Sequence, residues 1–137
     1  MKKEFSSAPE TMKTMDNWGV HWADLVTALP SPLFLVTAYK SNGQPNACLH
    51  SWACFNGNDS GFYAVLSSVN KSGHMYKTIH ETGVAVLNFP TAALSEKYFA
   101  TVANNGFDTD EITASGFTVE PAAIVNAPRI RECFLNI

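Results

Sequence analysis

The sequence has few charged residues and no apolar run long enough to cross a membrane. Only 15% of the 137 residues are charged, and no stretch approaches the ~18 consecutive apolar residues of a membrane helix. Nine basic residues are scattered along a chain of net charge −3, whereas a nucleic-acid-binding surface needs clustered Lys and Arg. The first segment, MKKEFSSAPETMKTM, has early lysines but no apolar core behind them, so it does not resemble a secretory signal. We expect binding to neither nucleic acid nor membrane.

Cysteine is scarce and odd in number. Cys48, Cys54 and Cys133 cannot all pair within the chain, so a reduced, cytoplasmic setting is expected. Even spacing predicts that Cys48, His50 and Cys54 share one face of a strand. The two cysteines would then lie about 20 Å apart, too far to share one zinc ion, and no metal site is expected. No helix start activates Cys54 as a nucleophile.

Several catalytic motifs are absent as well. There is no serine nucleophile elbow, no HExxH motif and no paired-carboxylate motif. The acidic residues 108–111 instead predict a helix cap. A 46% hydrophobic composition fits one globular domain over residues 1–137, with residues 1–15 peripheral or disordered. Because so few residues are charged, we expect a partner subunit or a ligand to cover some apolar surface.

The periodicity predicts a protein that is mainly β with helical decorations, an α+β fold. The expected strands are 33–39, 46–55, 62–67, 84–89 and 130–137. The expected helices are 16–29, 72–82, 92–104 and a short one opened by a capping box of Asp108 and Glu111. Asn42-Gly43 predicts a hairpin, and Gly83 and Gly116 are expected to end helices.

The stretch SSVNKSGHMYKTI, residues 67–79, runs from a strand into a helix and could bind an anion. A helix start offers free N–H groups and a positive dipole end. Ser72 is the expected N-cap, and Gly73 would allow a close approach to the backbone. The side chains that could contact an anion are those of Ser67, Ser68, Lys71, Ser72, His74 and Lys77. The alternative is a plain capped helix.

The strand before it, residues 46–52, mixes small and polar residues where a structural strand would carry Val and Ile. Ser51 and Trp52 are expected near the middle of the sheet. Small side chains would let a flat ligand reach backbone N–H and C=O groups. The alternative is a buried strand with a core tryptophan.

Three ordered segments carry a resemblance to a known family. They are PLFLVTAYKSNGQPNACLHSWACF, FYAVLSSVNKSGHMYKTIHETGVAVLNFP and FDTDEITASGFTVEPAAIVNAPRIRECFLNI. Over residues 32–137 the chain resembles the flavin reductase-like, flavoredoxin-type domain, whose fold is the FMN-binding split β-barrel. Members are usually longer, so the resemblance implies a barrel that is incomplete at the C-terminus.

The resemblance implies an FMN-binding oxidoreductase, either an NAD(P)H:flavin reductase or a flavoredoxin-like electron carrier. It further implies a homodimer with the flavin at the interface and a small-molecule electron acceptor. The residues matched to the flavin ring are Asn46, His50, Ser51 and Trp52. Those matched to the phosphate and ribityl chain are Ser67, Ser68, Lys71, Ser72 and His74. Catalytic residues are not assigned, because the flavin itself carries most of the chemistry; His74 is the one candidate.

Two other interpretations stay open. Met75 stands where the family often has Thr, and the chain is short. Both features would suit a non-catalytic flavin-binding protein or a dimeric scaffold, truncated relative to active members. An oxidase of the pyridoxamine-phosphate type shares the split-barrel architecture, but its phosphate clamp needs more arginine than Arg129 and Arg131.

Overall fold

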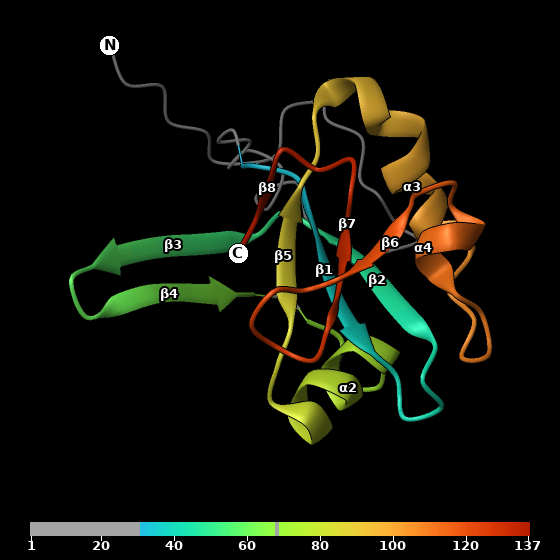
Figure 1. The fold of residues 1–137 in the computed structure, drawn as a ribbon, viewed down its shortest axis with the longest axis horizontal. Helices are drawn as coiled ribbons and strands as arrows, with labels where there is room; N and C mark the ends of the chain where they lie inside the picture. The colour runs from blue at the N-terminus through green and yellow to red at the C-terminus, as the bar shows by residue number, and fades with distance from the viewer. Residues whose placement is uncertain (1–30, 68) are drawn as a thin grey trace, which may run out of the picture. The chain divides into compact units, whose positions relative to one another are not determined.

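A four-stranded antiparallel sheet lies at the centre of the computed structural model, which describes residues 31–67 and 69–137 (Figure 1). The strand order is β2-β1-β5-β8. The bounds are Phe34–Tyr39 for β1, Pro45–His50 for β2, Val86–Phe89 for β5 and Leu135–Asn136 for β8. The expected helix 16–29 and residues 1–15 lie outside the described residues.

Strand β1 is the central element, because it pairs with both β2 and β5 and is buried from Phe34 to Ala38. Its side chains alternate between two apolar clusters, as the period of a strand requires. Leu35 packs with Tyr98 of α3 (Ser95–Ala103) and Ile112 of α4 (Glu111–Ala114). Phe34 packs in a second cluster with Met75 of α2 (His74–Thr82). Helix α2 therefore covers one face of the sheet, and α3 and α4 cover the other.

The β1–β2 hairpin confirms the Asn42-Gly43 prediction. Gly43 has φ 82°, a left-handed conformation that favours glycine. The turn is closed by Lys40 N donating to Gln44 O at 2.9 Å and by Gly43 N donating to Lys40 O at 2.8 Å. The hairpin places Lys40 directly after the last residue of β1.

The prediction of one strand over 46–55 is wrong. Strand β2 ends at His50, and β3 (Ala53–Asn58) pairs with β4 (Gly61–Leu66) in a separate two-stranded sheet. Ser51 and Trp52 connect the two sheets instead of lying inside one, and Trp52 is 50% exposed. Cys48 and Cys54 therefore belong to different sheets, so the expected shared face does not exist.

The helices differ from the sequence predictions mainly at their starts. The segment 92–104 divides into a 3₁₀ helix, Ala92–Leu94 (η2), followed by α3. The N-cap of α4 is Asp110, whose carboxylate accepts from Thr113 N at 2.9 Å. The capping box of Asp108 and Glu111 is therefore wrong. The left-handed glycines at Gly83 (φ 70°) and Gly116 (φ 80°) are confirmed.

The last predicted strand is mostly replaced by shorter ones. In place of 130–137, β7 (Pro128–Ile130) pairs with β6 (Val119–Pro121), and only β8 joins the main sheet. A fold that is mainly β with some helices is confirmed. Within residues 31–67 and 69–137 the strands form no closed barrel. No helix of this described part is long and apolar enough to span a bilayer.

Asn88 of β5 connects the sheet to the last strands. Its buried side chain donates from Nδ2 to Leu35 O at 3.0 Å and to Thr37 Oγ1 at 2.9 Å. Its Oδ1 accepts from Ile130 N at 2.8 Å and from Asn136 Nδ2 at 2.9 Å. One side chain thus satisfies groups on β1, β7 and β8, as a buried amide must if it is not to destabilise the core.

Candidate functional site

A cavity of about 260 Å³ runs along β2 between α2 and α3. Its wall is formed by 46–50 on β2, by 69–70 and 73–75 at the start of α2, and by Thr101, Val102 and Asn105 on and after α3. Strand β2 is an edge strand, and an edge strand leaves alternate backbone groups unpaired by the sheet. The cavity therefore lies where the backbone of β2 can contact a ligand.

A buried ion pair is hydrogen-bonded to the backbone of β2. Lys40 Nζ lies 2.9 Å from Glu111 Oε1, and the two side chains are 0% and 1% exposed. Lys40 also donates to Gly106 O at 2.6 Å and to Thr109 O at 2.8 Å, which uses all three ammonium protons. Glu111 Oε2 accepts from Ala47 N at 3.0 Å. Each charge thus has hydrogen-bond partners, the condition under which a buried pair is tolerated.

Two polar atoms on residues of the cavity wall lack hydrogen bonds within the described chain. Asn46 Nδ2 and His74 Nδ1 are buried and have no hydrogen-bond partner among the described residues. His74 Nδ1 lies 3.9 Å from Glu111 Oε1, beyond hydrogen-bond length. Buried unpartnered groups are rare in folded proteins because they cost stability. A buried polar group beside a cavity can find its missing partner in a ligand or, after a small movement, in a neighbouring side chain.

The structure brings some of the predicted residues together at this cavity and leaves others outside. Asn46, His50 and His74 line it. The remaining predicted residues in the described chain do not: Ser51, Trp52, Ser67, Lys71, Ser72 and Lys77. Ser67 donates its hydroxyl to Trp52 O at 2.9 Å, and Lys71 and Lys77 are exposed. Ser68 lies outside the described residues.

The prediction that Ser72 caps α2 is wrong. The N-cap is Gly73, with no side-chain cap among the described residues. Ser72 is held by Asn70 instead, whose Oδ1 accepts from Ser72 N at 3.0 Å and from Ser72 Oγ at 2.7 Å. Asn side chains commonly capture the backbone two residues on. That local bond removes the Ser72 hydroxyl from the helix start.

Lys40 and Glu111 were missed as site residues, and so was Asn70. A lysine beside an Asn-Gly turn is usually solvated, and Glu111 was assigned to a cap. The two residues are 71 positions apart, and no local pattern connects them. The Asn-x-Ser spacing of Asn70 and Ser72 was a usable signal for a turn.

The thiols near the site are not activated. Burial, reinforced by the negative charge of Glu111, raises the pKa of the Cys48 thiol, so Cys48 stays protonated and a poor nucleophile. Burial likewise raises the pKa of Cys133 to about 12. The described residues contain no group of three His, Cys, Asp or Glu side chains that could hold a metal ion.

Residues 26–137 match the family model of the flavin reductase like domain, which is well over half of the chain. The chain belongs to this family. The match includes all of β1 to β8 and therefore both walls of the cavity. No curated protein matches the chain.

Solved structures of related proteins share the fold of this flavin reductase-like domain. The flavoredoxin of Desulfovibrio vulgaris (Miyazaki F) is 26% identical over 88% of this chain, with a TM-score of 0.68. The flavoredoxin from Methanosarcina acetivorans is 26% identical over 94%, with a TM-score of 0.66. Nitrilotriacetate monooxygenase component B from Bacillus cereus is 18% identical over 100%, with a TM-score of 0.77, and shows the fold alone. The chain spans 62% of the length of each flavoredoxin and 67% of the third protein.

Proposed function

We propose that the protein binds FMN and acts as a flavoprotein oxidoreductase, either an NAD(P)H:flavin reductase or a flavoredoxin-like electron carrier. Family membership supports flavin binding. The observation that carries the proposal is the cavity on the edge strand β2, whose wall residues include the buried, unpartnered donor Asn46 Nδ2. We propose a single split-barrel domain over residues 1–137, located in the cytoplasm.

The residues present fit a flavin. A cavity of about 260 Å³ is smaller than the ~300–1,000 Å³ of most ligand pockets, so it would hold one part of FMN while the rest lies over the surrounding surface. Asn46 Nδ2 is a buried donor without a partner in the described part of the chain, and a small movement of its side chain would bring it to a carbonyl oxygen of the ring. The exposed side chain of Lys71 suits the phosphate. When bound, FMN would supply hydride and electron transfer, and the chain's part is to bind and orient it.

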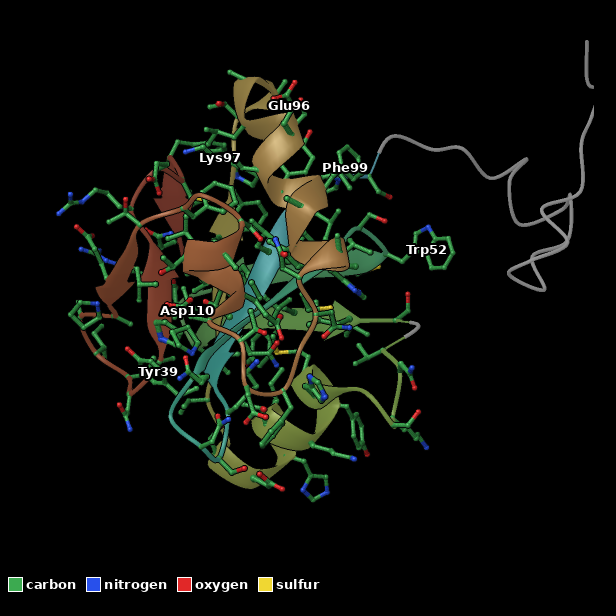
Figure 2. The ribbon with its side chains drawn as sticks, turned by 90° about the vertical axis from the view of Figure 1, so that its right-hand side faces the viewer. Tyr39, Trp52, Glu96, Lys97, Phe99 and Asp110 are labelled. Carbon is green, nitrogen blue, oxygen red and sulfur yellow. The ribbon has the colours of Figure 1, made fainter. Side chains whose placement is uncertain are left out.

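We propose a homodimer with the flavin at the interface. Large apolar side chains are exposed on the β3–β4 hairpin, on the connection before it and on α3: Trp52, Phe62, Tyr63, Val65, Phe99 and Val102. Figure 2 shows that Trp52 and Phe99 both project outward. Exposed large apolar side chains are typical of an interaction site, and a second copy of the chain would cover them.

Flavin content tests this proposal directly. The purified protein should be yellow, and after the flavin is stripped about one equivalent of FMN should restore the absorption band and raise the melting temperature. Lys71→Ala should weaken FMN binding by about 1–2 kcal/mol, the contribution of one charge-assisted hydrogen bond. A colourless protein with no FMN-dependent thermal shift contradicts the proposal.

A non-catalytic flavin-binding or scaffold role is the alternative, and Met75 favours it. The Met75 side chain is buried at the cavity wall and offers only a weak thioether acceptor where a hydroxyl could donate. NAD(P)H oxidation in the presence of added FMN separates the two roles. Turnover above the free-flavin background supports the oxidoreductase, and background-level turnover with bound FMN supports the alternative.

A further inference from the structure

His74 stands beside the buried ion pair without bonding to it. Its Nδ1 is buried and lies 3.9 Å from Glu111 Oε1. That oxygen already accepts from Lys40 at 2.9 Å, but a carboxylate oxygen can accept more than one hydrogen bond. A movement of about 1 Å would close a bond from Nδ1–H to Glu111. The carboxylate is therefore the natural partner of this nitrogen.

The other side of the ring faces away from the ion pair. The His74 side chain is 29% exposed although its Nδ1 is buried, so the accessible edge is the one that carries Nε2. Phe107 contacts the ring edge-on, with centroids 5.5 Å apart at 73°, and helps to fix its plane. His74 also lines the cavity. A histidine whose first nitrogen is turned to a carboxylate presents its second nitrogen to a ligand.

Three titratable groups surround this histidine, each from a different element. They are Glu111 of α4, Lys40 at the end of β1 and Cys48 of β2. The Cys48 thiol is neutral because burial raises its pKa. The charges of Lys40 and Glu111 are opposite, so the pair places no net charge beside His74. The α3 residues on the cavity wall, Thr101 and Val102, are uncharged.

We propose that Glu111 is a positioning residue that holds the proton of neutral His74 on Nδ1 and so leaves Nε2 as a hydrogen-bond acceptor at the cavity. The next step rests on the proposed function. The Nε2 acceptor receives an N–H or O–H group of the flavin, while Asn46 Nδ2 donates to one of the flavin oxygens. Lys40 holds Glu111 in place and offsets its charge. The cavity then offers one acceptor and one donor, which selects ligands that carry both.

The test is the tautomer of His74 in the full-length, flavin-free protein, read from long-range ¹H–¹⁵N spectra at a pH where the ring is neutral. The expected result is the Nδ1–H form. In the double variant Lys40→Met/Glu111→Gln, no lone charge stays buried. The Gln oxygen can still accept from Ala47 N, which leaves its amide N–H facing His74. The expected result is a reversal to the Nε2–H form, with FMN affinity lowered about tenfold, or ~1.4 kcal/mol.

Glu120→Gln is the control, because that carboxylate lies on the β6–β7 hairpin and bonds to Arg131; it should leave the tautomer unchanged. An Nε2–H form in the unmodified protein overturns the proposal, as does a double variant with the tautomer unchanged. If the double variant does not fold, the unmodified protein alone decides. An Nδ1–H form without FMN binding contradicts the proposed function only, and bound FMN with an Nε2–H form contradicts this inference only.

Discussion

Strands β2 and β3 are separated by only two residues, yet their surroundings are opposite. Asn46 and Ala47 of β2 are buried, and the backbone N–H of Ala47 donates to Glu111. The β3–β4 hairpin is stabilised by its own ladder, and most of its residues are exposed, including large apolar ones. The comparison teaches that a strand's role follows from its neighbours: β2 borders a cavity, and the hairpin offers exposed apolar side chains.

The largest expected effect is a loss of stability when the Glu111 carboxylate, which is hydrogen-bonded to β2, is removed. Glu111→Ala leaves Lys40 charged and buried, so the free energy of unfolding should fall by about 3–5 kcal/mol. Urea denaturation followed by circular dichroism measures it. Asn56→Ala on exposed β3 is the matched control and should change little. Equal midpoints for Glu111→Ala and the unmodified protein would show that the ion pair does not hold β2.

A charge placed on the β3–β4 hairpin should affect assembly and not folding. Val65→Glu places a charge on a side chain that is 66% exposed, so the fold should be retained while the proposed dimer dissociates. Light scattering should then give half the mass of the unmodified protein. Ile124→Glu, at a side chain that is 96% exposed outside this hairpin, should leave the mass unchanged. A monomeric unmodified protein would remove the basis for an interface flavin.

Strands β2 and β3 each carry one cysteine, and the two differ in burial. At pH 8 Cys54 of β3, which is exposed, should be alkylated first, and Cys48 of β2 several-fold more slowly, because the thiolate is the reactive form and burial raises the pKa of Cys48. Cys133, whose pKa is raised to about 12, should stay unmodified because its thiol is protonated at pH 8. Mass spectrometry of peptides over time measures all three. Equal rates for Cys48 and Cys54 would contradict the contrast in burial.

The smallest effect is expected at the cavity wall. Asn46→Ala removes an unpartnered donor, so it should lower FMN affinity about fivefold, close to the ~1 kcal/mol of one hydrogen bond, without reducing stability. Asn58→Ala at the exposed end of β3 should have no effect on binding. Fluorescence titration of FMN measures both. Unchanged affinity in Asn46→Ala would place the flavin elsewhere.

The sequence predicted the features that depend on local chemistry. The Asn42-Gly43 turn and the glycines that end helices at 83 and 116 are set by backbone conformations that few residues adopt. The family and the mainly-β fold were predicted as well. Asn46, His50 and His74 were predicted as site residues, and the structure places them along one cavity; their binding to flavin stays a prediction.

The rest depends on partners that are distant in the sequence. The break after His50 arises because β2 pairs with β1 and β3 pairs with β4, and the residue types in 46–55 do not reveal that change of partner. The role of Glu111 depends on Lys40, 71 positions away. The misplaced helix caps had local causes, since Asn70 binds Ser72 and Asp110 caps α4 in place of Asp108.

Asn88 sets an order of events for the growing chain. A ribosome delivers β1 and β5 first, so the Nδ2 bonds of Asn88 to Leu35 and Thr37 can form early. Its Oδ1 stays without its protein donors until Ile130, 42 residues later, and then Asn136 have been synthesised. Water must solvate that oxygen in the meantime, because a buried amide without partners is unstable. Closure of this core is therefore a late step that waits for β7 and β8, with the slow long-range pairing that such contacts bring.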